Sequence, residues 1–199
     1  MSALIEPVTV PQGERGDWRV EKFHVEAMSI ANLRLAREGR ACSPGVYTRL
    51  VHKRRGIIMS DTTAERRDHW SFILAAEGHV LINGLGLGMC LAAALARPKV
   101  IKATVIEIDQ DVIDLVWPTY AARPNVEIIQ DDAFAYRPPS GIRYGAVWHD
   151  IWDEICENNR PQMTKLHRKY GRLADWQGSW GMDRMNLERQ RDRRHRRLW

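Results

Sequence analysis

Val80-Leu-Ile-Asn-Gly-Leu-Gly-Leu-Gly88 is the stretch that decides the fold, because an apolar run of strand length leads directly into a glycine-rich turn. The residues that follow it, 89–96, are mostly apolar and suit a helix. Glycine lets the backbone approach a ligand closely and adopt positive φ, while the free amides of a helix start face that ligand. A strand, a glycine turn and a helix in this order are typical of a nucleotide site, although a purely structural turn has the same composition.

Strands and helices alternate downstream of this turn. We expect strands at 103–107, 125–129 and 144–148, with helices at 109–116 and 159–170. A fifth strand, at the edge of the sheet, is expected at 173–176. Because strands that alternate with helices form parallel sheets, the sequence predicts an α/β fold with a Rossmann-like, doubly wound and mostly parallel sheet.

Acidic residues follow the predicted strands. Glu107 ends the second strand, Asp132 follows the third, and Asp150 and Asp153 follow the fourth. The carboxyl ends of parallel strands meet at one edge, where open α/β sheets bind their ligands. A carboxylate at the end of the second strand can accept hydrogen bonds from ribose hydroxyls. The glycine spacing is Gly-x-Gly-x-Gly, whereas a dinucleotide site has Gly-x-Gly-x-x-Gly.

The segment from Val80 to Asp153 resembles the class I S-adenosylmethionine-dependent methyltransferase superfamily, and within it most closely the spermidine synthase group. The matching pieces are Gly-Leu-Gly-Leu-Gly, Val-Ile-Glu-Ile-Asp, Asp132-Ala133 and Tyr-Gly-Ala-Val-Trp-His-Asp, within about 75 residues. The chain is also similar to short methyltransferase-like proteins encoded by phages, which share its Asp-Ile-Trp and Trp-Gln-Gly-Ser-Trp segments.

This resemblance implies a role for each matched residue. The glycines of the turn would pass beneath the methionine moiety and ribose of S-adenosylmethionine, and Glu107 would bind the ribose hydroxyls. Asp132 would accept from the adenine amino group, with the amide of Ala133 near a ring nitrogen. The implied cofactor-binding residues are therefore Gly84, Gly86, Gly88, Glu107, Asp132 and Ala133. Asp150 would stand where the spermidine synthases have an acidic residue that helps to deprotonate the attacking amine, and Asp153 would match that family's second acidic residue, three positions on. Both are therefore expected to be catalytic.

Three features depart from the spermidine synthase pattern. Glu154 stands where that family has proline after the second acid, and the Tyr-His pair before the glycine turn is missing, with His69-Trp70 as the nearest substitute. Only about 45 residues follow Asp153, which leaves no room for the final antiparallel strands. We therefore expect a truncated class I methyltransferase fold. Four tryptophans flank the acceptor side, where they either cover the core or stack on an acceptor: Trp148, Trp152, Trp176 and Trp180.

These features predict an S-adenosylmethionine-binding transferase, a methyltransferase whose acceptor, expected to be a small molecule, is not identified. One alternative is a spermidine synthase-like aminopropyltransferase that uses decarboxylated S-adenosylmethionine. The other is a non-catalytic protein that binds the cofactor and contacts a partner through its C-terminal region.

Three regions are expected along the chain. Residues 1–77 would hold a loose arm, an N-terminal helix at 18–37, a β-hairpin at 46–59 and a helix at 62–77 that begins with a Thr62–Glu65 capping box. Residues 78–181 would form the cofactor-binding domain. Residues 182–199 form a basic tail that holds +4 of the net charge of +5. The tail is polar on every helical face, so we expect a frayed helix or disorder that is either solvated or bound to nucleic acid.

Composition sets the remaining expectations. No apolar stretch approaches the ~20 residues needed to span a bilayer, and the first residues do not form a secretory signal. The three cysteines are far apart and form no Cys-x-x-Cys pair. We therefore expect a cytoplasmic protein with reduced thiols, without a disulfide framework, a metal site or a membrane partner.

Overall fold

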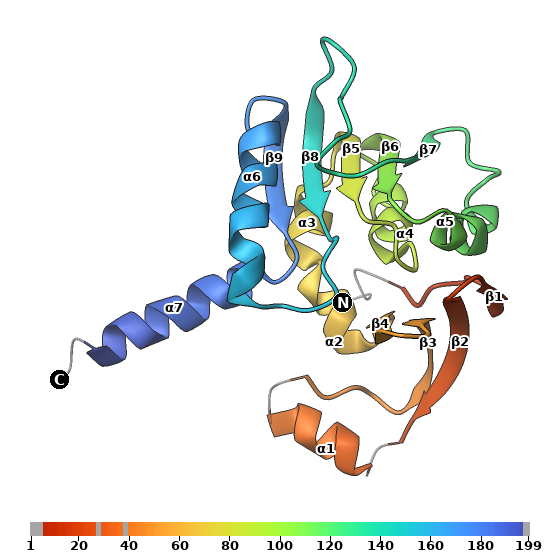
Figure 1. The fold of residues 1–199 in the computed structure, drawn as a ribbon, viewed down its shortest axis with the longest axis vertical. Helices are drawn as coiled ribbons and strands as arrows, with labels where there is room; N and C mark the ends of the chain where they lie inside the picture. Colours follow the sequence, from red (N-terminus) through yellow and green to blue (C-terminus); the bar gives the residue numbers. More distant parts are fainter. Residues whose placement is uncertain (1–5, 27–28, 38–39, 197–199) are drawn as a thin grey trace.

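The structure is a computed structural model that describes residues 6–26, 29–37 and 40–196. These residues form an antiparallel sheet, a parallel sheet and the helices around them (Figure 1). In chain order the elements are β1 (Gly13–Arg15), β2 (Trp18–Val25), α1 (Ile30–Arg37), β3 (Gly45–His52), β4 (Gly56–Ser60), α2 (Thr63–Asp68), α3 (Trp70–Ala75), β5 (Gly78–Asn83), α4 (Met89–Leu95), β6 (Val100–Glu107), α5 (Gln110–Val116), η1 (Trp117–Thr119), β7 (Val126–Gln130), β8 (Tyr144–His149), η2 (Glu157–Asn159), α6 (Arg160–Tyr170), β9 (Ala174–Ser179) and α7 (Met182–Arg196).

The larger sheet confirms the predicted fold class. Its strand order is β7-β6-β5-β8-β9, and every neighbouring pair is parallel. The five strands that the sequence predicts are all present, including the edge strand β9. The order reverses between β5 and β8, and at such a switch point the loops leave the sheet in opposite directions and open a crevice. No strand beyond β9 joins this sheet in the described part of the chain.

Helices cover both faces of this sheet. Because successive strand residues point to opposite faces, Val80 and Ile82 pack with α3, α4 and α5, whereas Leu81 packs with α6. All three side chains are buried. This burial on both faces explains why the parallel strands are continuously apolar in the sequence.

The N-terminal residues form a second sheet rather than the predicted helix at 18–37. Strands β1 to β4 are antiparallel in sequence order, and within the described part of 18–37 the helix is limited to residues 30–37. The prediction was wrong because the apolar residues near Phe23 were fitted to a helical period. In β2 burial alternates at its start, with Trp18 and Val20 buried and Arg19 exposed. The predicted hairpin at 46–59 is confirmed as β3 and β4.

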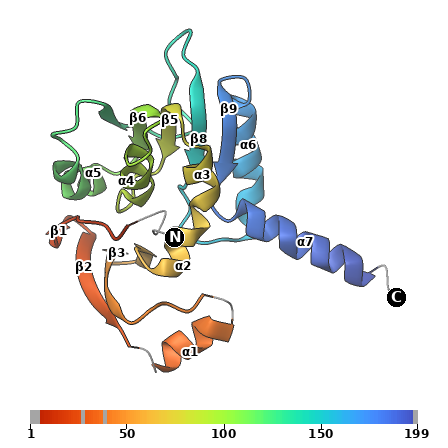
Figure 2. The same cartoon turned by 180° about the vertical axis from the view of Figure 1, so that it is seen from behind.

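The N-terminal sheet lies opposite the carboxyl ends of β5, β6 and β8, as both views show (Figures 1 and 2). The described part of the expected loose arm, from residue 6 on, is packed in place, because Val8 and Val10 are buried and the Val8 amide donates to Asp61. The predicted helix at 62–77 is interrupted at His69. The predicted Thr62–Glu65 capping box is not formed: Glu65 accepts from the Ser60 amide, and Thr62 makes no side-chain cap.

The basic tail forms the long helix α7, which projects away from both sheets in the two views (Figures 1 and 2). Its first turn is anchored by the buried side chain of Met185, whereas Leu187 is exposed. Of the two predictions for the tail, a helix or disorder, the helix is confirmed over residues 182–196. Among the described residues, no helix combines the length and apolar character required to cross a bilayer.

Candidate functional site

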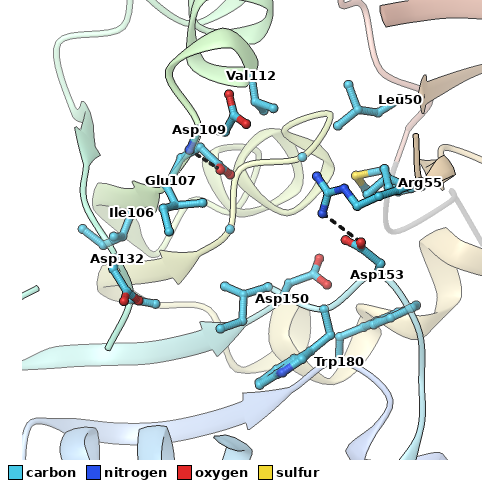
Figure 3. Close-up of a pocket in the computed structure, with 18 of the residues that line it drawn as sticks. Leu50, Arg55, Ile106, Glu107, Asp109, Val112, Asp132, Asp150, Asp153 and Trp180 are labelled. Atoms are coloured by element: carbon cyan, nitrogen blue, oxygen red, sulfur yellow. Dashed lines mark hydrogen bonds and ion pairs between the residues drawn. The ribbon is translucent and has the colours of Figure 1, made fainter. Parts of the chain in front are cut away.

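A cavity of about 400 Å³ lies at the carboxyl ends of β5, β6, β7 and β8 (Figure 3). This volume falls within the range of small-molecule and cofactor sites. The opposite wall is supplied by the N-terminal sheet through Trp18, Leu50, Arg55, Ile58 and Met59. The cavity therefore occupies the switch-point crevice of the parallel sheet, and a second layer of structure covers it.

Glu107 is held in a fixed position at the end of β6. One carboxylate oxygen accepts from the Leu85 amide at 2.8 Å, and the other accepts from the Asp109 amide at 3.0 Å. Burial raises the pKa of Glu107, and these backbone hydrogen bonds oppose that rise. Each oxygen keeps a further lone pair for a ligand hydroxyl. The geometry is compatible with the predicted contact to a ribose.

The three glycines of the turn all have positive φ, and each is closely approached by other atoms. An added Cβ would lie 2.0 Å from the Asp150 carbonyl oxygen at Gly84, and 2.6 Å from the Tyr120 hydroxyl at Gly88. At Gly86 it would lie 2.2 Å from the sulfur of Met59, whose side chain also lines the cavity. Gly84 and Gly86 line the cavity, whereas Gly88, which packs against Tyr120, does not.

Asp132 and Ala133 lie in the turn after β7, and both line the cavity. One Asp132 oxygen accepts from the Phe134 amide at 2.8 Å, which orients the carboxylate. The Ala133 amide has no hydrogen-bond partner among the described residues. An acceptor and a donor presented side by side suit the edge of an adenine ring.

Asp150 follows β8 and faces the cavity (Figure 3). Burial, together with the carboxylates of Glu65, Asp68 and Glu107, raises its pKa to about 7. The nearest basic group is His69 Nδ1 at 3.9 Å, but burial lowers the pKa of His69 to about 4. The two groups are therefore not an ion pair at neutral pH. A carboxyl group that titrates near pH 7 is suited to accept a proton in that range.

Asp153 lies at the rim of the cavity, where its carboxylate accepts from Arg55 Nη1 at 2.8 Å (Figure 3). The Arg55 guanidinium also lies 4.8 Å from the ring centre of Trp18. The Trp18 indole N–H in turn donates to Asp109 at 2.7 Å. Trp18 and Met59 were missed as site residues, because nothing in their local sequence shows that this sheet folds over the cavity. Arg55 belongs to the basic turn 52–55 of the hairpin, which the sequence leaves open as either a solvated turn or a loop that touches a ligand.

Carboxylates dominate the charge of the cavity. Its acidic lining residues are Glu65, Glu107, Asp109, Asp131, Asp132, Asp150 and Asp153. Arg55 is the one basic residue among its lining side chains whose charge is permanent. A low-dielectric cleft lined by one sign of charge concentrates ligands of the opposite sign. The cavity therefore favours a ligand with a net positive charge.

The other candidates divide between core and cavity. Trp148 is buried and stacks with Phe72 and Trp176, so these two tryptophans serve the core. Trp152 and Trp180 line the cavity. His149 is buried, and its Nδ1 lies 2.8 Å from the Asn83 amide nitrogen, so it is a core residue. Asp109 caps α5, as the sequence suggested, and also lines the cavity.

No family model matches this chain. Among solved structures it is similar to the N-methyltransferase NodS from Bradyrhizobium japonicum, with a TM-score of 0.44 and 13% identity over 55% of this chain and 62% of that one. It is also similar to the CcbJ methyltransferase from Streptomyces caelestis, with a TM-score of 0.41 and 24% identity over 55% and 44%. The match to the 23S rRNA methyltransferase ErmE has a TM-score of 0.36 and 23% identity over 43% and 34%. The chain thus spans only part of these proteins, and at these identities the likeness concerns the path of the chain.

Proposed function

We propose that this protein is an S-adenosylmethionine-dependent methyltransferase whose acceptor enters beside Asp150. The observation that carries the proposal is the meeting of Glu107, the Gly86 turn, the Asp132–Ala133 turn and Asp150 around one cavity. Each of these features was expected from the sequence to contact a different part of the cofactor or acceptor. Their convergence at the switch point of a parallel sheet is the arrangement that such a ligand requires.

The residues fit this cofactor in shape and in charge. Glu107 offers oxygens for two hydroxyls, and Asp132 with the Ala133 amide offers an acceptor and a donor for a purine edge. The acidic lining suits a sulfonium and an ammonium group, which make S-adenosylmethionine a cation overall. The bound cofactor supplies a methyl group on a positively charged sulfur, which is an activated electrophile.

Asp150 would act on the acceptor rather than on the cofactor. As an acceptor oxygen or nitrogen bonds to the methyl carbon, the carbon–sulfur bond breaks and its electron pair remains on sulfur. The proton lost by the acceptor passes to the Asp150 carboxylate, whose pKa of about 7 suits a base at neutral pH. Most of the rate is expected to come from alignment of donor and acceptor in the covered cavity.

An aminopropyltransferase is the second candidate, and the observation that favours it is again the acidic cavity, which would also suit a polyamine. Against it stand Glu154 in place of proline and the absence of the Tyr-His pair. In the third alternative, a non-catalytic binding protein, cofactor would bind without transfer to any acceptor.

Substitutions at two cavity acids test the cofactor site. Glu107→Gln and Asp132→Asn should each weaken binding of S-adenosylmethionine by about tenfold or more, because each loses a charge-assisted hydrogen bond worth ~1.5–3 kcal/mol. Isothermal titration calorimetry measures the change. Glu127→Gln is the matched control, since Glu127 pairs with Lys102 on the outside of the sheet. Unchanged affinity in both folded cavity variants would refute the site.

The projecting helix α7 supports a contact with nucleic acid as an additional property. Arg184, Arg189 and Arg191 are exposed on it, and Glu157 is the acidic partner of Arg189 from outside the helix. Arginines that contact phosphates release counterions, so such binding falls steeply with salt.

Removal of residues 187–199 tests this contact while keeping the buried Met185 in place. We expect affinity for S-adenosylmethionine to be unchanged, and salt-sensitive binding of RNA or DNA to be lost. Electrophoretic shift assays at two salt concentrations compare the shortened and intact proteins. A shift that survives the deletion, or no shift by the intact protein at low salt, would contradict a nucleic-acid role for the tail.

A further inference from the structure

Three potential metal ligands meet at the edge of the cavity, and two of them, His69 and Asp150, line it. They are His69 at the junction of α2 and α3, Cys90 in the first turn of α4, and Asp150 after β8. One donor atom from each lies within 4.8 Å of the donors of the other two. This is the one such group of three or more histidine, cysteine or acidic residues in the described ranges. The sequence analysis missed it, because the three residues are far apart along the chain.

The ring of His69 points to a missing ligand. Its side chain is 2% exposed, and Nδ1 has no hydrogen-bond partner among the described residues. The nearest acidic oxygen, on Asp150, is 3.9 Å away, which is too far for a hydrogen bond. Buried polar atoms in proteins nearly always have a partner. A ring nitrogen of His69, a carboxylate oxygen of Asp150 and the Cys90 sulfur lie within 4.8 Å of one another, so one ion could reach all three.

The donor set identifies the class of ion. Imidazole nitrogen, thiolate sulfur and carboxylate oxygen are the three kinds of ligand that zinc takes, whereas calcium and magnesium take oxygen. Donors in a tetrahedral zinc site are about 3.4–3.7 Å apart, as follows from bond lengths of about 2.0–2.3 Å. Separations of up to 4.8 Å would have to shorten by up to about 1.1–1.4 Å, which requires small rotations of more than one of the three side chains.

We propose that His69, Cys90 and Asp150 bind a Zn²⁺-class transition metal ion through three protein ligands, with a fourth position open to the cavity. His69 and Asp150 both line this cavity, so a ligand entering there reaches the fourth position. Three protein ligands with one open position are the arrangement of reactive rather than structural zinc sites. With the ion bound, Asp150 would be a ligand instead of the proton acceptor described above, and the ion would be the Lewis acid nearest the acceptor.

Cobalt binding to tag-free, chelator-treated full-length protein tests the site. Co²⁺ alone should bind one-to-one and give the intense visible bands of a four-coordinate site, with a near-ultraviolet sulfur-to-cobalt charge-transfer band. Zn²⁺ should abolish both. Cys90→Ser should lose the charge-transfer band, and His69→Gln should weaken Co²⁺ binding at least tenfold. Cys156→Ser is the matched control, because Cys156 lies outside the cluster, and it should behave as the unmodified protein does.

X-ray absorption of the zinc-loaded unmodified protein covers the case in which a variant fails to fold. It should show one sulfur at about 2.3 Å, with nitrogen or oxygen at about 2.0–2.2 Å. A shell without sulfur, a charge-transfer band that survives Cys90→Ser, or no saturable Co²⁺ binding would each overturn the proposal. These readouts do not need S-adenosylmethionine, so failure of the metal site is distinguishable from failure of the proposed function.

Discussion

Gly86→Val is expected to abolish binding of S-adenosylmethionine while the protein remains folded. Gly86 has φ of +49°, which a β-branched residue rarely adopts, and its added Cβ would lie 2.2 Å from the sulfur of Met59. Met59 would then be pushed within the cavity, or the turn would move away from the Glu107 contact at Leu85. We expect affinity to fall at least about a hundredfold, equivalent to about 2.7 kcal/mol, by calorimetry.

Gly141→Val is the control that separates the effect of a side chain added at the cavity from the effect of backbone strain. Gly141 also has positive φ, at +76°, but no atom lies within 4 Å of its added Cβ, and it does not line the cavity. The Gly141→Val protein should lose stability through a similar backbone strain and still bind the cofactor normally. Normal binding by Gly86→Val would contradict the placement of the ligand at this turn, and so would an equal loss in Gly141→Val.

Asp150→Asn should stabilise the metal-free protein at high pH. The pKa of Asp150 is raised from 3.8 to about 7 on folding, so the folded state favours the protonated acid. That contribution to stability is fully present below pH ~4 and is lost as pH rises to about 7. Asparagine cannot ionise, so the variant escapes this loss. We expect its advantage in free energy of unfolding to grow by about 2–4 kcal/mol between pH 4 and pH 8.

Urea unfolding across this pH range, in the presence of a chelator, measures the effect. Other titrating groups, including His69, are common to both proteins and cancel in the difference. Asp153→Asn is the control: its exposed ion pair with Arg55 should contribute under ~1 kcal/mol at every pH. A difference between Asp150→Asn and the unmodified protein that does not change with pH would show that the carboxyl group is not held protonated by its surroundings.

The parallel sheet could be predicted because its signals are local. The central strands β5 and β8 are short apolar runs buried on both faces, and Gly84, Gly86 and Gly88 mark the turn after β5. The order of strands and acids along the chain then places Glu107, Asp132 and Asp150 at one edge, since parallel strands all end there. All three line the cavity that the structure contains.

The covering layer could not be predicted, because it depends on contacts between distant segments. Trp18 reaches Asp109, and Arg55 reaches Asp153, across 91 and 98 residues of sequence. The strand β2 was predicted to be a helix. Its pairing with β3 determines which face of β2 is buried and which is exposed, and the local sequence does not reveal that pairing. His69, Cys90 and Asp150 likewise meet only after three separate elements pack together.

Calorimetric titration of the purified protein with S-adenosylmethionine, its decarboxylated form and S-adenosylhomocysteine is the most direct test of the central claim. We predict saturable one-to-one binding of S-adenosylmethionine and S-adenosylhomocysteine, with weaker binding of the decarboxylated compound. Tighter binding of the decarboxylated compound would contradict the methyltransferase assignment in favour of aminopropyl transfer. No saturable binding of any of the three would contradict the claim that this cavity is a cofactor site.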